Sequence, residues 1–325
     1  MIGINFPVTE LLNSAKNDAN TYLVSICIPT FNRVSDLKVC LGSLLAKYGN
    51  SCQVEIVVID NGSSDGTSYF LNENCNSFTN TSFYIRKFNS GYDVNLLDCY
   101  YRAKGSYVHF LGDDDLIIFK SFDDLILLLE KDEPDLVISE YTITTSRKTF
   151  NAVNKQGKKF DEITDLLSYV GHHLTFMSLI TLKKQPAEIQ YMYRYTNFKF
   201  MHISLILEVL SGKCFNLIFL SNPIVAATDT NYASYDVAEY FMIDLIRSFQ
   251  LNIKKLDLVK LQPFFVSVLC HCIESNVSLI KVVPYNAIIA IAGFKCWFNP
   301  KLLKSFLMRT VRKTAKKVGL HAGGR

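Results

Sequence analysis

The sequence lacks both common glycine-rich phosphate loops. No Gly-x-x-x-x-Gly-Lys and no Gly-x-Gly-x-x-Gly segment occurs in its 325 residues, which argues against a P-loop enzyme and against a dinucleotide-binding enzyme of the usual kind. It also has no internal repeat, no low-complexity tract and, in residues 1–20, no basic stretch followed by an apolar one. We therefore expect a globular protein without a secretory leader.

Cysteines are present, but not in a pattern that binds zinc or forms a disulfide framework. The nine cysteines are odd in number and scattered, and Cys270-His-Cys272 is too closely spaced for the usual zinc pairs. Most of them fall in segments predicted as strands or helices, such as Cys27, Cys40 and Cys99. Buried thiols in a reducing cytoplasm explain this distribution best.

Acidic residues are absent after Glu274. The tail that follows has ten lysines and arginines and an apolar stretch, residues 287–294, which is too short for a membrane span of about 20 apolar residues. Residues 302–311 have apolar side chains at helical spacing, with lysine and arginine opposite. Such a basic amphipathic helix indicates an anionic membrane surface as partner. No nucleic-acid motif accompanies the tail, so we expect no nucleic-acid partner.

Strand and helix patterns alternate through the first third of the chain. Short apolar runs begin at Val24, Val54, Phe83 and Tyr107, and each is closed by a turn signal. Helical spacing follows the first three runs, in residues 35–48, 67–74 and 96–103, with Ser35 as the expected N-cap of the first helix. This order predicts an α/β fold with a mostly parallel sheet and helices on both faces.

Polar clusters follow three of these predicted strands. They are residues 30–33, residues 60–65 and the three consecutive carboxylates Asp113, Asp114 and Asp115. The carboxyl ends of parallel strands meet at one edge of a sheet, where open α/β folds bind ligands. Three adjacent carboxylates repel each other unless a divalent cation binds there, and such hard oxygen ligands suit Mg²⁺ or Mn²⁺.

These clusters resemble, in order and spacing, the motifs of family-2 glycosyltransferases. The matching segments are Pro29-Thr-Phe-Asn-Arg33, Ile59-Asp-Asn-Gly-Ser-Ser-Asp-Gly66, Asn89-Ser-Gly91 and Leu111-Gly-Asp-Asp-Asp115. With Thr175-Phe-Met-Ser178 further on, the chain is most similar to the bacterial O-antigen subset that includes abequosyltransferases. The resemblance implies a nucleotide-sugar-binding domain of the GT-A type over residues 1–230. A helical C-terminal region with the membrane-surface tail then covers residues 231–325.

The resemblance assigns most of the polar residues to the nucleotide-sugar. It implies that Asp60 hydrogen-bonds the base or the ribose and that the loop from Asn61 to Asp65 closes over the nucleoside. Asn95 matches an asparagine beside the nucleotide-sugar, with Asp93 close by. The full set of expected nucleotide-sugar-binding residues is Pro29, Thr30, Asn32, Arg33, Asp60, Asn61, Ser63, Asp93, Asn95 and Asp113.

The expected metal site departs from the family pattern by one residue. The usual pattern is Asp-x-Asp-Asp, and here Gly112 stands in place of the first Asp. Asp113 and Asp115 keep the x-spacing, whereas Asp114 keeps the alignment with the family's main metal ligand. Side chains one residue apart point oppositely on a strand, which argues against all three binding one ion directly. We expect Asp114, helped by Asp115, to hold Mg²⁺ or Mn²⁺.

The resemblance also implies an acceptor hydroxyl that attacks the anomeric carbon, which in an inverting reaction needs a general base. The Glu-Asp pair that usually supplies this base in the family is missing. His202, in a predicted helix over residues 200–210, takes roughly its place, and a neutral histidine is a competent base near pH 7. Asp229 is a second candidate, and His172 and His173 are weaker ones. A core role for His202 stays open.

Partners and location are implied by the same resemblance. They are a CDP-linked dideoxyhexose donor and an undecaprenyl-diphosphate-linked oligosaccharide acceptor, used in O-antigen synthesis. The basic tail adds the expected location, the cytoplasmic face of the inner membrane. Two other functions stay open. One is a non-catalytic nucleotide-sugar-binding protein, which the missing Glu-Asp pair favours. The other is a nucleotidyltransferase on a related α/β sheet.

Overall fold

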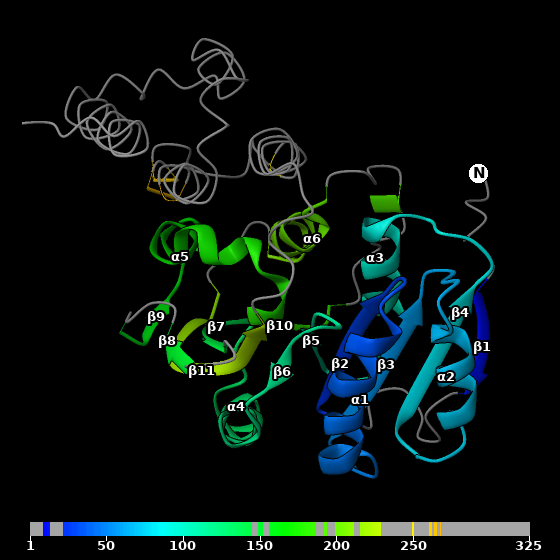
Figure 1. Cartoon of the computed structure of the whole chain (residues 1–325). Helices are drawn as coiled ribbons and strands as arrows, with labels where there is room; N and C mark the ends of the chain where they lie inside the picture. Colours follow the sequence, from blue (N-terminus) through cyan, green and yellow to red (C-terminus); the bar gives the residue numbers. More distant parts are fainter. Residues whose placement is uncertain are drawn as a thin grey trace, which may run out of the picture.

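The computed structural model of this chain describes residues 9–13, 22–144, 149–151, 156–185, 192–193, 199–210 and 215–228, with Phe249, residues 260–261 and 263–264, and Ser267. Within these residues a single sheet runs through the molecule and has helices on both faces (Figure 1). The α/β class predicted from the sequence is confirmed.

Parallel strands form the centre of the sheet. Their order is β4 (Thr81–Arg86), β3 (Val54–Asp60), β2 (Val24–Thr30) and β5 (Tyr107–Phe110). Every residue of β2 and β3 is buried, as expected for strands with helices on both faces. The pairing of β2 with β3 sets Thr30 level with Asp60, so the polar residues that follow these strands emerge at the same edge.

Further strands extend this parallel core on both sides. They are β1 (Thr9–Asn13), β6 (Leu116–Ile117), β7 (Leu136–Thr144), β8 (Thr149–Asn151), β9 (Lys158–Phe160), β10 (Ile180–Lys183) and β11 (Leu217–Thr228). β1 is antiparallel to β4, β10 is antiparallel to both β5 and β7, and β11 is parallel to β7. The sheet is thus more mixed than the sequence pattern indicated. The connection that enters β10 consists of α5 (Ile163–Val170) and two short 3-10 turns, η1 (Gly171–Thr175) and η2 (Met177–Leu179).

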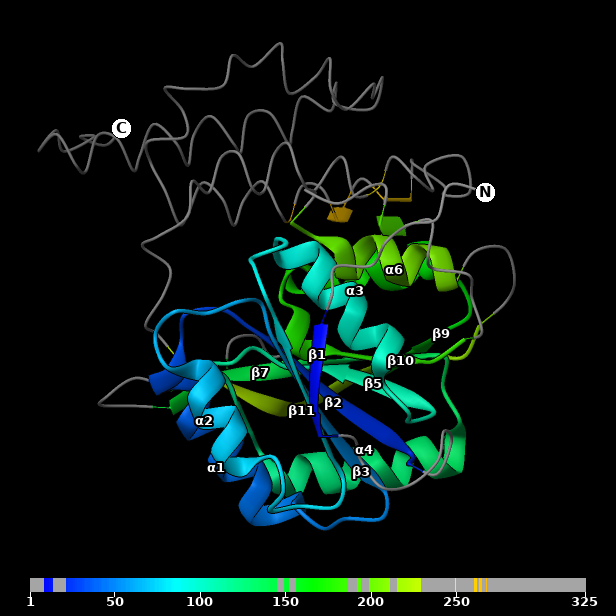
Figure 2. The ribbon, with the colours of Figure 1, turned by 90° about the vertical axis from the view of Figure 1, so that its right-hand side faces the viewer.

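Two hydrophobic clusters lie on the two faces of this sheet. One face is covered by α1 (Val34–Tyr48), α2 (Thr67–Asn74) and α4 (Phe119–Asp132), and the other by α3 (Tyr92–Arg102), α5 (Ile163–Val170) and α6 (Met201–Val209) (Figure 2). Side chains alternate between the faces along each strand. Ile26 and Ile28 of β2 therefore join the first cluster, while Cys27 joins the second.

The helix starts at the functional edge differ from the sequence prediction. α1 begins at Val34, one residue before the expected cap Ser35, and its first N–H donates to Asp65 Oδ2 over 2.8 Å. Asp65 also accepts the N–H of Thr67, the first residue of α2, over 3.1 Å. One carboxylate from the β3–α2 loop thus satisfies donors at two helix N-termini, a long-range arrangement that local capping preferences do not reveal.

The described residues beyond residue 230 pack against the rest of the protein. Phe249, Leu261 and Phe264 are buried in the same cluster as α3, α5 and α6. Ser267 Oγ accepts the backbone N–H of His172 over 3.2 Å. Asp229 and the predicted basic amphipathic helix lie outside the described residues, and the boundary near residue 230 stays a prediction. No helix in the described part of the chain has the length and apolar character needed to cross a bilayer.

Candidate active site

The loop after β2 is joined to the loop after β3 by the backbone N–H and the side chain of Asn32. The Asn32 N–H donates to Ser63 Oγ over 2.8 Å, and Asn32 Oδ1 accepts the N–H of Ser64, also over 2.8 Å. Asn32 has a φ of 53°, a left-handed conformation that asparagine tolerates better than most residues. Residues that lie 31 and 32 positions apart in the predicted nucleotide pocket are therefore held in one arrangement.

Asp60 ends β3 and is fully buried. Its Oδ1 accepts hydrogen bonds from the backbone N–H and the hydroxyl of Ser63, and its Oδ2 accepts the hydroxyl of Ser68 over 2.6 Å. In this structure Asp60 shapes the loop that was expected to close over the nucleoside. Oδ1 thus accepts two hydrogen bonds and Oδ2 one, and the carboxylate is fully buried, so the expected contact with a base or ribose stays a prediction.

The loop after β4 packs directly onto the loop after β3. Asn61 Nδ2 donates to Asn89 Oδ1 over 2.8 Å, and Asn61 Oδ1 accepts the N–H of Ser90 over 3.0 Å. Gly62 has a φ of 77°, and a Cβ there would lie 2.7 Å from the backbone carbon of Phe88. The turn requires glycine both for its conformation and for this close approach. The Asn89-Ser-Gly91 segment thus joins the same edge as the other motifs.

Asn95 and Asp93 lie at the start of α3 and are both buried. Asn95 Nδ2 donates to the carbonyl of Ile59 over 3.0 Å, and Asp93 Oδ2 accepts the N–H of Lys199 over 3.0 Å. Both residues therefore brace the edge in this structure. Their predicted contacts with a nucleotide-sugar stay predictions.

Asp113 and Asp114 converge on one cation, the guanidinium of Arg33. Arg33 Nη1 lies 3.1 Å from Asp113 Oδ1 and 2.7 Å from Asp114 Oδ2. Asp113 Oδ2 also accepts the hydroxyl of Thr30 over 2.7 Å. Thr30 and Arg33 come from the end of β2, and the carboxylates from the end of β5, so the parallel pairing of these strands builds the cluster.

Asp115 turns away from that cation toward Ser178. Ser178 Oγ donates to Asp115 Oδ2 over 2.5 Å and accepts the N–H of Gly112 over 2.9 Å. Asp114 shares the guanidinium with Asp113, while its Oδ1 and Asp115 Oδ2 both lie near the position that a Cβ on Gly112 would take. The expected pairing of Asp114 with Asp115 at a metal ion stays a prediction. Ser178 was noted only as part of a motif, and its fully buried hydroxyl is a structural element of the site that the sequence did not indicate.

Burial disfavours the charged forms of two of these carboxylates. It raises the pKa of Asp113 to about 6 and that of Asp115 to about 7, from an ordinary value of 3.8, against opposing hydrogen bonds from Thr30 and Ser178. Nearby positive charge keeps such groups ionised. The cluster is therefore a place where a cation is strongly favoured.

A divalent metal fits this cluster only with help from a ligand. Among the residues that the structure describes, no group of three His, Cys, Asp or Glu side chains is arranged to hold a metal ion. The carboxylates of Asp113 and Asp114 do meet at the Arg33 guanidinium. Mg²⁺ is often held in proteins by one or two carboxylates together with substrate phosphates. The donor set of Asp113 and Asp114 fits that incomplete type of site.

The position of Gly112 gives a direct test of this geometry. A Cβ on Gly112 would lie 2.6 Å from Asp115 Oδ2 and 3.0 Å from Asp114 Oδ1, so the carboxylates occupy the space where the family pattern has an Asp side chain. We expect Gly112→Ala to displace both carboxylates and to lower kcat/KM by roughly 10²-fold, the cost of about 1 Å of misplacement. Steady-state kinetics measures this. Gly42→Ala, where a Cβ meets nothing within 4 Å, is the matched control, and equal activity of both variants would contradict the expectation.

Of the predicted general bases, His202 and His173 are buried, His172 is partly exposed, and Asp229 lies outside the described residues. His202 in α6 is 2% exposed, and its Nε2 lies 3.1 Å from the carbonyl oxygen of Leu174. Burial lowers its pKa to about 4. The imidazole is a core group in this structure, and an acceptor hydroxyl therefore has no access to it. His173 is equally buried, His172 Nδ1 lies 3.0 Å from Ser267 Oγ, and Asp229 is not among the described residues.

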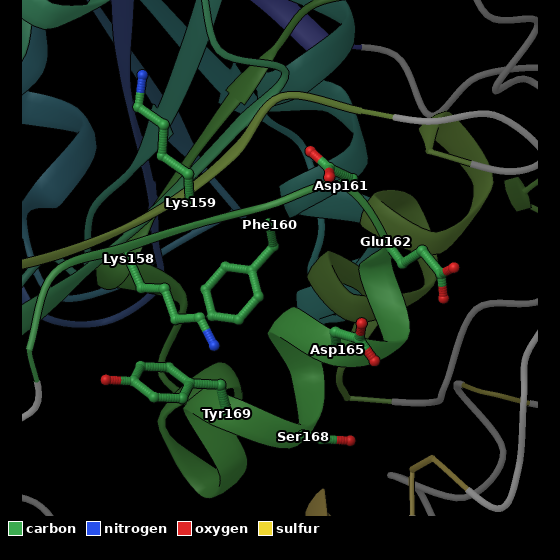
Figure 3. A pocket seen from close by; sticks show the side chains of 8 residues that line it. All are labelled: Lys158, Lys159, Phe160, Asp161, Glu162, Asp165, Ser168 and Tyr169. Atoms are coloured by element: carbon green, nitrogen blue, oxygen red, sulfur yellow. The ribbon is translucent and has the colours of Figure 1, made fainter.

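A separate hollow of about 500 Å³ lies beside α5 and β9 (Figure 3). Its lining residues are Lys158, Lys159, Phe160, Asp161, Glu162, Asp165, Ser168 and Tyr169. Lys158 reaches over the rings of Phe160 and Tyr169, with Nζ 4.9 and 5.6 Å from their centroids. None of the sequence-predicted site residues lines this hollow, so it is distinct from the edge described above.

Comparison with known proteins gives relatives of one activity class. The abequosyltransferase of Salmonella typhimurium is 25% identical over 248 residues, which cover 70% of this chain and 74% of the relative. TarP of Staphylococcus aureus, a poly(ribitol-phosphate) β-N-acetylglucosaminyltransferase, is 25% identical over 226 residues, 67% of this chain and 63% of its own length. An uncharacterised glycosyltransferase of Mycoplasma pneumoniae is 31% identical over 121 residues, but this stretch covers only 37% of this chain and 40% of the relative.

A solved structure shares the fold. Residues 1–349 of S. aureus TarS match with a TM-score of 0.57 and 16% identity, covering 82% of this chain and 77% of that chain. This likeness concerns the fold alone, and it confirms the GT-A-type architecture expected from the motifs. Residues 25–188 match the family described as "Glycosyl transferase family 2", a span that contains β2, β3, β5, their loops and Ser178. The chain therefore belongs to glycosyl transferase family 2.

Proposed function

We propose that this protein transfers a sugar from a nucleotide-sugar donor held at the edge formed by the loops after β2, β3 and β5. The observation that carries the proposal is the pair Asp113 and Asp114, which meet one positive group at the carboxyl end of the parallel strands. TarS has the same fold, and its structure in complex with UDP-GlcNAc matches this chain with a TM-score of 0.53. A nucleoside diphosphate as the leaving group is consistent with this.

The chain's own residues would prepare the donor for departure of the diphosphate. Thr30 and Ser178 orient Asp113 and Asp115, and Asn32 holds the two nucleotide loops together. Asp114 and Asp113 would hold Mg²⁺ or Mn²⁺, which when bound supplies charge stabilisation to the departing diphosphate. The general base stays unassigned among the described residues. We carry forward Asp229, the second candidate from the sequence, because the first candidate, His202, is buried.

The donor and acceptor classes belong to this proposal. The relative from Salmonella typhimurium is an abequosyltransferase, which supports a CDP-linked dideoxyhexose as donor. An undecaprenyl-diphosphate-linked oligosaccharide as acceptor and a role in O-antigen synthesis follow from the same similarity. Other sugars and other bases are compatible with the described site, since no described contact reads either of them.

A panel of nucleotide-sugars tests the proposal. The purified full-length protein is incubated with CDP-, UDP-, GDP- and dTDP-linked sugars, Mn²⁺ and polyprenyl-diphosphate oligosaccharides, and the products are analysed by mass spectrometry. Transfer by a glycosyltransferase releases a nucleoside diphosphate and a longer oligosaccharide. Transfer of the nucleotidyl group, with release of a sugar 1-phosphate, would indicate a nucleotidyltransferase instead. Donor binding without turnover for any acceptor would favour the non-catalytic alternative.

We also propose that the basic tail holds the protein at the cytoplasmic face of the inner membrane. Residues 287–317 combine apolar and aromatic side chains with most of the ten basic residues after Glu274. We expect co-sedimentation with phosphatidylglycerol vesicles that weakens but persists as salt rises, because charge is screened over about 10 Å at 0.1 M ionic strength while apolar burial remains. Truncation after Glu274 should leave the protein in the supernatant. Equal partitioning of the truncated and full-length forms would contradict the proposal.

A further inference from the structure

Arg33 supplies the positive charge between Asp113 and Asp114. One nitrogen, Nη1, contacts both carboxylates, at 3.1 and 2.7 Å. The Arg33 side chain is 24% exposed, that of Asp114 21% and that of Asp113 8%. The ionic contact is thus partly shielded, which strengthens it relative to a surface pair, and it is still reachable by a ligand.

We propose that Arg33 couples the binding of the divalent cation to the binding of the donor diphosphate. The inference rests on the proposed function, because it requires both ligands at this edge. Nη1 lies against Asp113 Oδ1 and Asp114 Oδ2, so a cation that takes these two oxygens displaces the guanidinium from them. Cation binding without a diphosphate therefore loses two charge-assisted hydrogen bonds.

The exchange is confined to the arginine side chain. The backbone on both sides of Arg33 is held: Asn32 is bonded to Ser63 and Ser64, and the N–H of Val34 donates to Asp65. Arg33 immediately precedes α1, so its Cα has a fixed position while its long side chain can change rotamer. Loop closure is not needed for the displacement.

The donor diphosphate gives the displaced guanidinium a new anionic partner. Arginine presents a planar set of donors that matches phosphate oxygens. A cation bound to Asp113 and Asp114 would draw the diphosphate to within reach of the same side chain. Each ligand then tightens the binding of the other. The cation releases the guanidinium from the carboxylates, and the diphosphate gives the released guanidinium a new ionic contact.

This coupling is measurable as a ratio of dissociation constants. By linkage, the factor by which a diphosphate tightens the binding of Mn²⁺ equals the factor by which Mn²⁺ tightens the binding of the diphosphate. Some coupling arises without Arg33, because the cation itself contacts the diphosphate. The part due to Arg33 is the difference between the wild type and a variant without the guanidinium, and we expect it to be about tenfold or more, within the usual range of such factors.

The test is a titration of Mn²⁺, followed by its electron paramagnetic resonance signal, with and without CDP, UDP, GDP or dTDP. For the wild type we expect weak binding of Mn²⁺ alone and much tighter binding with the diphosphate that fits. For Arg33→Gln we expect tighter binding of Mn²⁺ alone, because the competing cation is gone, and weaker diphosphate binding. The coupling factor should fall by about tenfold. Lys47→Gln is the matched control, because it removes one positive charge from an exposed ion pair with Asp123, roughly 20 Å away at the other end of α1.

The possible outcomes separate the two proposals. A wild-type protein that binds none of the four diphosphates with Mn²⁺ would overturn both the proposed function and this inference. Normal binding of both ligands, with the same coupling factor in Arg33→Gln as in the wild type, would overturn the inference alone. Should Arg33→Gln fail to fold, Arg33→Lys takes its place: weaker coupling than in the wild type supports the inference, and unchanged coupling overturns it.

Discussion

Replacing Asp114 by Asn is expected to abolish sugar transfer while leaving the fold intact. The substitution removes one carboxylate charge from the pair that would hold the divalent cation, and such a cation stabilises the departing diphosphate by several kcal/mol, which corresponds to roughly 10³-fold in rate. Asp114 is partly exposed and lies in the loop after β5, so its loss should create no core defect. Steady-state kinetics with the donor identified by the panel measures the effect.

Two comparisons make this prediction specific. Asp124→Asn removes an exposed carboxylate from α4 and should leave both activity and thermal stability unchanged. Treatment with EDTA should reproduce the loss in the wild type, and added Mn²⁺ should reverse it. Retained transfer by Asp114→Asn, together with indifference to EDTA, would remove the metal-dependent mechanism from consideration.

Replacing Asp98 by Ala is expected to destabilise the whole domain. Arg86 and Asp98 form an ion pair whose side chains are 1% and 2% exposed, and Tyr193 donates its hydroxyl hydrogen to Asp98 over 2.6 Å. Removing the carboxylate leaves the Arg86 guanidinium buried without its partner, which costs about 3 to 5 kcal/mol. Chemical unfolding in urea, followed by circular dichroism, measures this loss.

The double variant Arg86→Met, Asp98→Leu is the informative control. Replacing both charges by apolar groups of similar size is often neutral or stabilising, because no uncompensated charge remains. We therefore expect the double variant to be more stable than Asp98→Ala alone. Its affinity for the nucleotide-sugar should still fall, because Arg86 also approaches Asn95 Oδ1 at 3.4 Å and Ser90 Oγ at 3.3 Å. Asn95 is one of the residues expected to bind the nucleotide-sugar. A double variant as unstable as Asp98→Ala would show that packing and the hydrogen bond lost by Tyr193, and not the buried charge, dominate here.

Local patterns in the sequence were sufficient for the central strands and for the edge of the sheet at which the polar residues meet. The apolar runs from Val24 and Val54 are buried on both faces, which produces an unbroken hydrophobic pattern. Because parallel strands align their carboxyl ends, the polar residues after them had to meet at one edge. Helix starts were less well predicted, because the donors at the start of α1 are satisfied by Asp65 from a distant loop.

The sequence by itself determined the α/β architecture, the family and the residues that gather at the edge, because these depend on short-range periodicity and on motif order. Only the tertiary structure decided how those residues pair. It joined Asp113 with Asp114 through Arg33, turned Asp115 to Ser178 and placed His202 in the core. Such choices depend on contacts between residues that are 28 to 83 positions apart in the chain. The free energies of these contacts depend on which distant residues are buried together and on the charges that they bring. A local sequence pattern does not contain this information.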